Sequence, residues 1–282
     1  MHKLKRIPYF RYDTESAFES GTEYLRIFLP CERGFVNFNI IRSVKPEAFA
    51  DIFRLGKAFA YDDNLENGYA ITPERAEWDM AIKIVSREDF IGGLIHGDEI
   101  SDGISVIVDG KAVNVSDFTD FTPFTEMKIT VNSVGYDPAD HKTEALLHKK
   151  EYTVTENGIT SRQRVEFLGD FTLENSYLAM MPPCKDFTDS YFTDLDQDPK
   201  PATSGTRISG AKSATVFGAE SGISFTMAIP EYPTLFGGDQ FCLSDNGGRN
   251  YNKMYFPVTT ADTVKCGDVW NSVTEYKIKI SS

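Results

Sequence analysis

The sequence predicts an all-β protein, an antiparallel two-sheet sandwich of the jelly-roll type with at most one or two short helices. Most segments alternate apolar and polar residues, which is typical of strands that bury one face. Turn pairs such as Asn-Gly and Asp-Gly separate these segments and favour tight antiparallel hairpins. No strand–helix unit repeats along the chain, so a parallel α/β sheet is not expected. Strands at this spacing indicate a sandwich.

Each expected strand follows from its own pattern. The segment 77–85, EWDMAIKIV, places four apolar side chains on one face: Trp78, Met80, Ile82 and Ile84. Three hairpins are expected, at Asp109-Gly110, at Asn157-Gly158 and at residues 220–222. Residues 268–280 alternate without interruption and are expected to form the closing strand.

Residues 45–56 are the segment with a helical pattern. Pro46 suits the first turn of a helix, and Phe49, Ile52 and Phe53 recur at helical spacing. A buried strand would use the same residues equally well. Both structures therefore stay open for this segment.

The chain is expected to form one β-sandwich domain over residues 21–282, with residues 1–20 as a loosely attached N-terminal arm. No linker or repeat divides it, and single β domains often reach a length of this order. Two segments, 135–146 and 183–210, are expected to be long loops. Long loops on a β scaffold usually cover or line a functional site.

The composition narrows the function classes. A formal net charge of −13 disfavours general binding to nucleic acid or anionic membranes, because the protein's field repels both. No apolar run approaches the roughly 18 residues of a membrane span. The first residues are basic but lack an apolar run, so we expect a protein that is cytoplasmic, particle-borne or already without its leader. The scattered cysteines contain no C-x-x-C pair and are expected to be reduced: Cys31, Cys184, Cys242 and Cys266.

The stretch GGLIHGDE, residues 92–99, carries the first candidate for chemistry. Its glycines allow backbone conformations that other residues avoid, so His96 is expected at a sharp turn pointing into a concave face. Asp98 or Glu99 would orient its ring, which leaves one nitrogen free to act as a general base. The alternative is an ordinary loop histidine. Tyr177, beside small and flexible neighbours, is a second candidate, against the alternative of a core tyrosine.

The hairpin at residues 148–167 carries a row of cations. Alternation places Arg162 and Arg164 on one sheet face, and pairing through the turn is expected to bring Lys150 close to them. Guanidinium groups in such a row suit a carboxylate or sulfate on a sugar. The alternative is a solvated face whose cations pair with Glu151 and Glu166.

Further ligand contacts are expected elsewhere. The segment 245–256, DNGGRNYNKMYF, joins Tyr251, Asn252 and Lys253, a mixture of groups that is common in sugar-binding clefts and in plain hairpins; Trp78 completes the set. Residues 194–198, DLDQD, have the acid density of a calcium loop without its glycine and distal glutamate. Serine-hydrolase, zincin, phosphate-loop and dinucleotide motifs do not occur. We therefore expect no cofactor, with calcium as the weaker alternative.

The segments EWDMAIKI, DFIGGLIHGDE, ISVIVDGKAV, SYLAMMP and GDVWNSVTEYKI together resemble β-sandwich proteins of gut bacteria and their phages, whose build is similar to jelly-roll polysaccharide lyases. The resemblance implies β-elimination on an acidic, uronate-containing glycan. His96 would be the base, Tyr177 the acid, and Arg164 the group that neutralises the uronate carboxylate. Arginine there would stabilise the developing enolate electrostatically.

Two other functions stay open. A non-catalytic glycan-binding or particle-attachment module fits the missing signal peptide, and its N-terminal arm would dock to a neighbouring subunit in a homo-oligomer. A plain structural β protein needs nothing from His96. Both the enzyme and the binding module have a polysaccharide or glycan as partner, and neither has nucleic acid or membrane.

Overall fold

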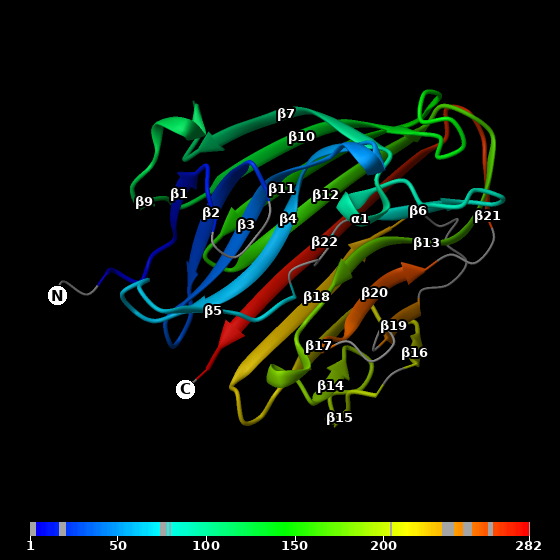
Figure 1. Cartoon of the computed structure of the whole chain (residues 1–282). Helices are drawn as coiled ribbons and strands as arrows, with labels where there is room; N and C mark the ends of the chain where they lie inside the picture. The colour runs from blue at the N-terminus through cyan, green and yellow to red at the C-terminus, as the bar shows by residue number, and fades with distance from the viewer. Residues whose placement is uncertain are drawn as a thin grey trace.

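The protein is described here by a computed structural model that covers residues 4–16, 21–73, 78, 80–203, 205–232, 240–244, 250–258 and 262–281. It is an all-β protein with two antiparallel sheets, as the sequence predicts (Figure 1). Its helical content among these residues is one four-residue turn, α1 (Gly93–His96), and three short 3-10 turns: η1 (Pro46–Ala48), η2 (Val115–Asp117) and η3 (Lys185–Phe187).

The larger sheet has sixteen strands in the described part of the chain. Fourteen follow one another in this spatial order: β15 (Lys200–Pro201), β14 (Ser190–Thr193), β17 (Ser213–Phe217), β18 (Ile223–Glu231), β22 (Val269–Ile280), β12 (Gly158–Phe167), β11 (Glu144–Thr155), β10 (Met127–Tyr136), β7 (Glu99–Val108), β4 (Ala50–Tyr61), β3 (Phe35–Lys45), β2 (Glu23–Pro30), β1 (Tyr9–Asp13) and β9 (Thr122–Pro123). Two short strands, β5 (Gly68–Ala70) and β8 (Lys111–Val113), pair with β4 and β7.

The smaller sheet packs against β11, β12 and β22 of the large sheet and is built from six strands in the described residues: β16 (Thr206–Ser209), β19 (Gln240–Ser244), β20 (Lys253–Val258), β13 (Phe171–Met181), β21 (Asp262–Val264) and β6 (Ala81–Ile84). Strand β6 is shorter than the predicted strand at 77–85. Ile82 and Ile84 of β6, with Met80 just before it, pack with Leu173 and Leu178 of β13, while Trp78 belongs to the main core. The side chains from β6 and β13 meet the large sheet at Leu146, Val165 and Trp270 in one buried cluster.

The large sheet folds over itself to make the two layers of the sandwich. Strands β4 and β7 are the one parallel pair in the described part of this sheet, and they pair at two positions, Ala50 with Glu99 and Asp51 with Ile100. Beyond that joint the strands diverge, and β1–β4 pack across the main core against β10–β12 and β22 (Figure 1). Trp78 lies between the layers, with ring centroids 5.9 Å from Phe38 and 5.3 Å from Tyr276.

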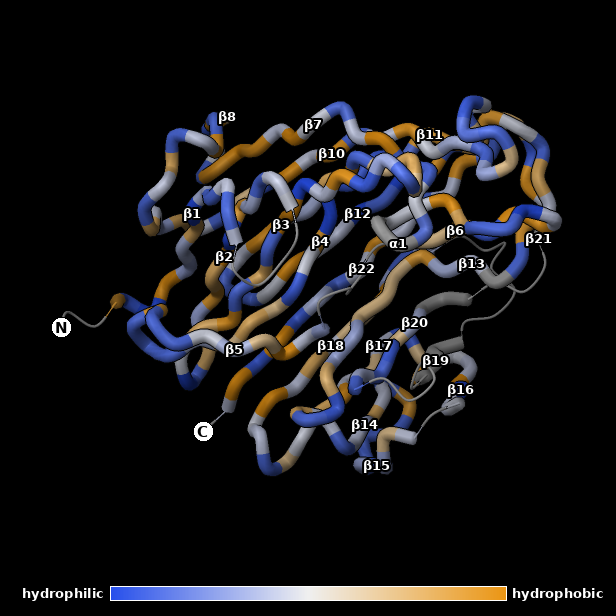
Figure 2. Tube along the Cα trace, viewed as in Figure 1, coloured by the Kyte–Doolittle hydropathy of each residue, from blue (hydrophilic) through white to orange (hydrophobic). Residues whose placement is uncertain are grey.

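All three predicted hairpins form. Strands β7 and β8 turn at Asp109-Gly110 and β17 and β18 at residues 218–222, while β11 and β12 turn at Glu156-Asn157, one residue before the predicted pair, because Gly158 already pairs with Thr155. Residues 269–280 form a strand as predicted, but β22 lies inside the sheet, between β12 and β18. Alternation of hydrophobic and hydrophilic residues is visible along many of these strands in Figure 2.

One open alternative is decided and two local predictions are corrected. Residues 45–56 form the buried strand and not the helix: after η1 the chain runs into β4, where Ile52, Phe53 and Leu55 are buried on both faces and pairing with β3 satisfies the backbone. Residues 9–13 do not belong to a loose arm, because β1 pairs with β2 and β9 and buries Phe10. Segment 183–210 is not one loop but contains η3, β14, β15 and β16.

Two further features follow from the described residues. Cys31, Cys184 and Cys266 have free thiols, as expected, while the side chain of Cys242 lies outside the described residues. None of the helices described is long and apolar enough to cross a membrane.

Candidate functional site

A cleft opens where β4 and β7 diverge, at the mouth of the sandwich. Its volume is about 530 Å³, and we call it the mouth cleft. It is lined by Tyr12, Glu23, Arg42, Phe53, Ser101, Asp102, Gly103, Ile104, Val106, Val113, Asn114, Val115 and Ser116. The cleft exists because the two layers are joined at Ala50 and Glu99 and are splayed apart beyond them.

One wall of the mouth cleft carries a connected polar network. Arg42 donates from Nε and Nη2 to both oxygens of Asp51, at 2.9 and 3.0 Å, and from Nη1 to Glu23 Oε1 at 2.8 Å. The hydroxyl of Tyr12 donates to Glu23 Oε2 at 3.1 Å. Bidentate guanidinium–carboxylate pairs are geometrically specific, so Arg42 holds both carboxylates in fixed positions.

The opposite wall belongs to the other layer. Ser101 accepts a hydrogen bond from the backbone of Phe53 at 3.3 Å, which ties the two layers together at the cleft. Ser116 donates to the side-chain oxygen of Asn114 at 3.0 Å. The floor is apolar and includes Phe53 and Val106. An apolar floor with a few convergent polar groups is typical of small-ligand sites.

The mouth cleft is electronegative. Glu23, Asp51 and Asp102 face the single cation Arg42, so the formal charge of these four groups is −2. Hydrogen bonds from Arg42 to Asp51 and Glu23 raise the pKa of its guanidinium further above the ordinary value. Burial, and then the hydrogen bond to Glu23, raise the pKa of the Tyr12 phenol, which therefore stays protonated and a donor. Such a site suits a neutral ligand rich in hydroxyl groups.

None of the ten residues proposed from the sequence lines the mouth cleft. The structure places His96 at the end of α1, where its Nδ1 lies 3.3 Å from Asp89 Oδ1 and its ring lies 4.4 Å from that of Phe90. The expectation that Asp98 or Glu99 orients this ring is wrong. The turn of α1 sends these two carboxylates elsewhere, because Gly97 and Asp98 both have positive φ and reverse the chain after His96.

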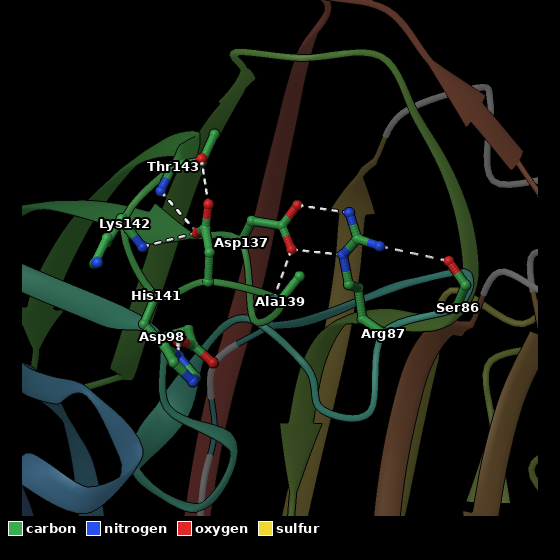
Figure 3. A network of polar contacts seen from close by, with 9 residues as sticks. Ser86, Arg87, Asp98, Asp137, Ala139, His141, Lys142 and Thr143 are labelled. Carbon is green, nitrogen blue, oxygen red and sulfur yellow. Dashed lines mark hydrogen bonds and ion pairs between the residues drawn. The ribbon is translucent and has the colours of Figure 1, made fainter.

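Asp98 instead accepts a hydrogen bond from Nδ1 of His141, in the loop between β10 and β11 (Figure 3). Burial raises the pKa of Asp98, and the hydrogen bond from His141 opposes that rise. In the same loop Asp137 pairs with Arg87, with Nη2 2.8 Å from Oδ2, and this bond lowers the pKa of Asp137. The loop is shorter than the predicted 135–146, since it spans 137–143 between β10 and β11, and it is fixed at two points.

Glu99 and Lys150 belong to a buried polar cluster formed by strands β4, β7, β10 and β11 of the large sheet. Lys150 Nζ donates to the carbonyl of Phe53 at 3.1 Å and lies 3.6 Å from Glu99 Oε1. His148 Nδ1 lies 3.1 Å from the same oxygen, and Ser133 donates to it as well. Burial alone would raise the pKa of Glu99. The charges of Lys150 and His148 and these hydrogen bonds outweigh it and hold that pKa well below its ordinary value.

The expected closeness of Lys150 to Arg162 and Arg164 is wrong. In the hairpin, Arg162 lies opposite Glu151, and Arg164 lies opposite Lys149. Side chains alternate between faces along a strand, so Lys150 points into the core while the arginines point to solvent.

The outward face of this hairpin carries paired charges. Arg164 Nη1 lies 2.9 Å from Glu166 Oε2, and Lys149 Nζ lies 3.1 Å from Glu151 Oε1. These are the ion pairs that a solvated face predicts. Because they are exposed, each contributes little to stability.

The other candidates lie in or near the smaller sheet. Tyr177 is largely buried, and its ring centroid lies 4.9 Å from that of Tyr255. Phe90 packs against the cluster of Tyr177, Ala81 and Met180 and also stacks on His96, so the structure brings His96 and Tyr177 to one shared neighbour. The exposed side chain of Arg164, on the outward face of the large sheet, takes no part in that cluster.

The remaining candidates are mostly buried. Trp78 is enclosed in the core. Tyr251 pairs with Cys184 through an isolated antiparallel β-bridge, and Asn252 donates its backbone N–H to the carbonyl of Pro183 at 2.9 Å. Lys253 Nζ lies 5.6 Å from the ring centroid of Tyr255.

Sequence reasoning missed the mouth cleft, although a signal for it exists. Glu23 continues the inward series of Leu25 and Ile27 on β2, and Arg42 continues that of Phe38 and Ile40 on β3. Charged residues at inward positions, opposite each other at the ends of paired strands, indicate a polar opening of the core.

Comparisons with known proteins find likeness in structure only. No family model matches this chain, and no curated protein matches it. The galactosidase domain of an alpha-galactosidase-sucrose kinase has a TM-score of 0.50 at 10% identity, over 90% of this chain and 40% of that chain. A GH36 alpha-galactosidase from Geobacillus stearothermophilus has a TM-score of 0.45 at 10% identity, over 94% of this chain and 40% of that chain. A galactose 1-epimerase from Lactobacillus acidophilus has a TM-score of 0.44 at 9% identity, over 97% and 99%.

The likeness shows the fold alone, and this chain spans about two fifths of the length of the two galactosidases. The expected relation to jelly-roll polysaccharide lyases is wrong, because the structure that this chain resembles at a TM-score of 0.50 is a galactosidase domain and not a lyase. Alternating strands and tight hairpins, which suggested that relation, occur in every antiparallel sandwich and do not separate one family from another.

Proposed function

We propose that this protein binds a neutral carbohydrate in the mouth cleft. The observation that carries the proposal is the network of Tyr12, Glu23, Arg42 and Asp51 over an apolar floor. It is supported by the likeness in fold to a galactosidase domain, and galactose-type sugars are accordingly the first ligands to test.

The chemistry of the cleft favours hydroxyl groups. Each carboxylate oxygen has a second lone pair beyond the bond it already accepts, and a sugar hydroxyl can donate to it. Ile104 and Val113, which line the cleft and are only partly buried, offer an apolar surface for the C–H face of a sugar ring. Binding is expected to need little rearrangement, because Arg42 already holds Glu23 and Asp51 in place.

The charge of the cleft sets its selectivity. With a formal charge of −2, it repels a uronate carboxylate and tolerates an uncharged sugar. We therefore expect galactose-containing oligosaccharides to bind more tightly here than the corresponding galacturonates. This choice of a neutral ligand replaces the acidic glycan expected from the sequence.

The test is calorimetric titration of the intact protein with neutral and uronate oligosaccharides of matched length. Glu23→Gln should weaken binding of the neutral sugar about tenfold or more, since a hydrogen bond to a charged group contributes about 1.5–3 kcal/mol. Glu151→Gln is the matched control, because that carboxylate is exposed on the far face and pairs with Lys149. The proposal is overturned if Glu23→Gln and Glu151→Gln bind the neutral sugar equally tightly. It is also overturned if the mouth cleft binds uronates more tightly than neutral sugars.

A further inference from the structure

A second cavity, of about 610 Å³, lies on the outward face of β14, β17, β18 and β22. Strand register builds it in two rows. Phe192, Thr215, Thr226 and Lys277 are neighbours across the four strands. Phe217, Ser224 and Lys279 form the adjacent row, two residues along each strand.

These side chains point outward because their sequence neighbours point inward. Val216, Phe225 and Ile278 alternate with them and belong to the main core. The two rows therefore form one surface, which we call the lysine groove. It lies on a different layer face from the mouth cleft and shares no lining residue with it.

The lysine groove contains the groups that a sugar ring uses. The rings of Phe192 and Phe217 lie 5.8 Å apart at one end and offer an apolar platform. The hydroxyls of Thr215 and Thr226 lie 2.8 Å apart and share one hydrogen bond, so one O–H remains to donate. Ser224 adds a third hydroxyl.

One rim of the groove is held in place before any ligand arrives. Ser221 donates to the carbonyl of Phe187 at 2.8 Å and accepts from the backbone of Ile223 at 3.1 Å. Gly222 has a φ of +67°, and a side chain there would come within 2.9 Å of the Ser281 carbonyl. The turn at residues 218–222 is thus tightly fitted against the end of β22.

The lysine groove differs from the rest of the molecule in the sign of its charge. The chain has a formal net charge of −13, yet the residues lining the groove include Lys277 and Lys279 and no carboxylate. Glu275 is the nearest acid along β22, two residues before Lys277, and it lies outside the lining. Among the described residues neither lysine forms an ion pair, unlike Lys149 and Arg164 on the same sheet face.

We propose that the lysine groove is a second binding site, and that its ligand is a sugar bearing an anionic group such as a carboxylate or sulfate. Aromatic rings, hydroxyls and two ammonium groups that form no ion pair in the described residues lie along one surface, although Glu32 and Glu156 line a neighbouring cavity with the same lysines. The anionic group contacts Lys277 and Lys279, and the ring lies toward Phe192 and Phe217. This inference goes beyond the proposed function, because it concerns different residues and a ligand of different charge.

The experiment is a titration of the intact chain with a galacturonate trisaccharide and a sulfated galactose trisaccharide, each followed by calorimetry at low salt. Lys277→Met and Lys279→Met should each raise the Kd for the acidic sugars at least tenfold, and added salt should weaken binding to the unmodified protein. Lys149→Met is the control and should leave Kd unchanged. If Lys277→Met and Lys279→Met change the Kd for the acidic sugars no more than Lys149→Met does, the proposal is overturned.

Two further arms identify what is bound. Inorganic phosphate is titrated alongside, and Phe217→Ala should weaken the acidic sugars without changing phosphate. Phosphate that binds as tightly as the sugars would show a simple anion site and overturn the sugar assignment.

Glu23→Gln should not affect the Kd of the acidic sugars. If Glu23→Gln abolishes their binding and the lysine variants do not, the site is the mouth cleft. Neutral sugars, tested in parallel, decide the proposed function separately.

Discussion

Replacing Lys150 with methionine is expected to destabilise the protein strongly. Methionine fills much of the same space as the lysine stem but removes the ammonium group. Lys150 and Glu99 are both almost completely buried, with Nζ 3.6 Å from Oε1. After Lys150→Met, Glu99 keeps its burial and loses the largest of the charges that compensate for it.

The magnitude follows from that distance. At an effective dielectric constant of about 20, unit charges 3.6 Å apart attract by roughly 5 kcal/mol. Measured losses on removing one partner of a buried pair are about 3–5 kcal/mol. Because burial then dominates the pKa of Glu99, the carboxyl can take up a proton and limit the loss. We therefore expect a decrease of about 3–5 kcal/mol in the free energy of unfolding near pH 7.

The dependence on pH has a definite sign. The folded state holds the pKa of Glu99 below its ordinary value of 4.5, so the stabilisation is present above that pH. It is lost as the pH falls below about 4.5 towards the folded pKa. The unmodified protein should therefore lose this contribution on acidification, whereas Lys150→Met should not, since it lacks the contribution already.

Urea unfolding followed by fluorescence measures both effects, at pH 7 and at steps down to pH 3. The double variant Glu99→Gln with Lys150→Met is the control, since it removes both charges and should be more stable than Lys150→Met alone. A Lys150→Met protein within about 1 kcal/mol of the unmodified chain would refute the reasoning. So would a double variant less stable than Lys150→Met.

Two more predictions concern single groups. Tyr276→Phe removes the donor 2.6 Å from the Trp78 carbonyl, which keeps the backbone N–H of Met180 at 3.2 Å, and should cost about 0.5–1.5 kcal/mol in urea unfolding, because one buried hydrogen bond is lost; an unchanged midpoint would contradict this. In the folded protein at pH 8, Cys266 should react quickly with a thiol reagent because it is exposed, whereas burial raises the pKa of half-buried Cys184 to about 11 and should slow it. A fast phase that survives in Cys266→Ser would contradict that assignment.

The features that the sequence predicts correctly, hairpin positions and the inward and outward faces of strands, depend on residues adjacent in the chain. The sequence places a hairpin turn within one residue of the observed Glu156-Asn157 turn, and alternation along the strands then separates inward Lys150 from outward Arg162. Residues 45–56 were ambiguous because burial of Ile52 and Phe53 is compatible with helix and strand alike. Tertiary pairing with β3 decides between them, and no local pattern reports that pairing.

The mouth cleft depends on a long-range joint and could not be predicted from local patterns. Glu23, Arg42 and Ser101 come from three strands separated by up to 78 positions, and they meet because β4 and β7 pair near Ala50 and then part. Charged residues at inward positions of β2 and β3 were the available signal. It required knowing that the two strands end at the same edge of the sandwich.

The stretch GGLIHGDE explains how that joint is made. A side chain at Gly97 would come within 1.9 Å of the Ala48 carbonyl, and one at Gly92 within 2.7 Å of the Met80 carbonyl. Only glycine allows α1 to approach η1 and β6 so closely. Asp98 then donates its backbone N–H to Ala48 at 2.9 Å, and the next residue, Glu99, pairs with Ala50.

From this joint the chain continues directly into the mouth cleft, whose wall begins at Ser101, while the side chain of Glu99 turns inward to Lys150. The glycines and acids that stood out in the sequence therefore have an architectural role. They fasten the two layers at one end, and the opening beyond that end is the site proposed to bind sugar. A residue pattern that suggests a catalytic turn can thus mark the position of a site without supplying its side chains.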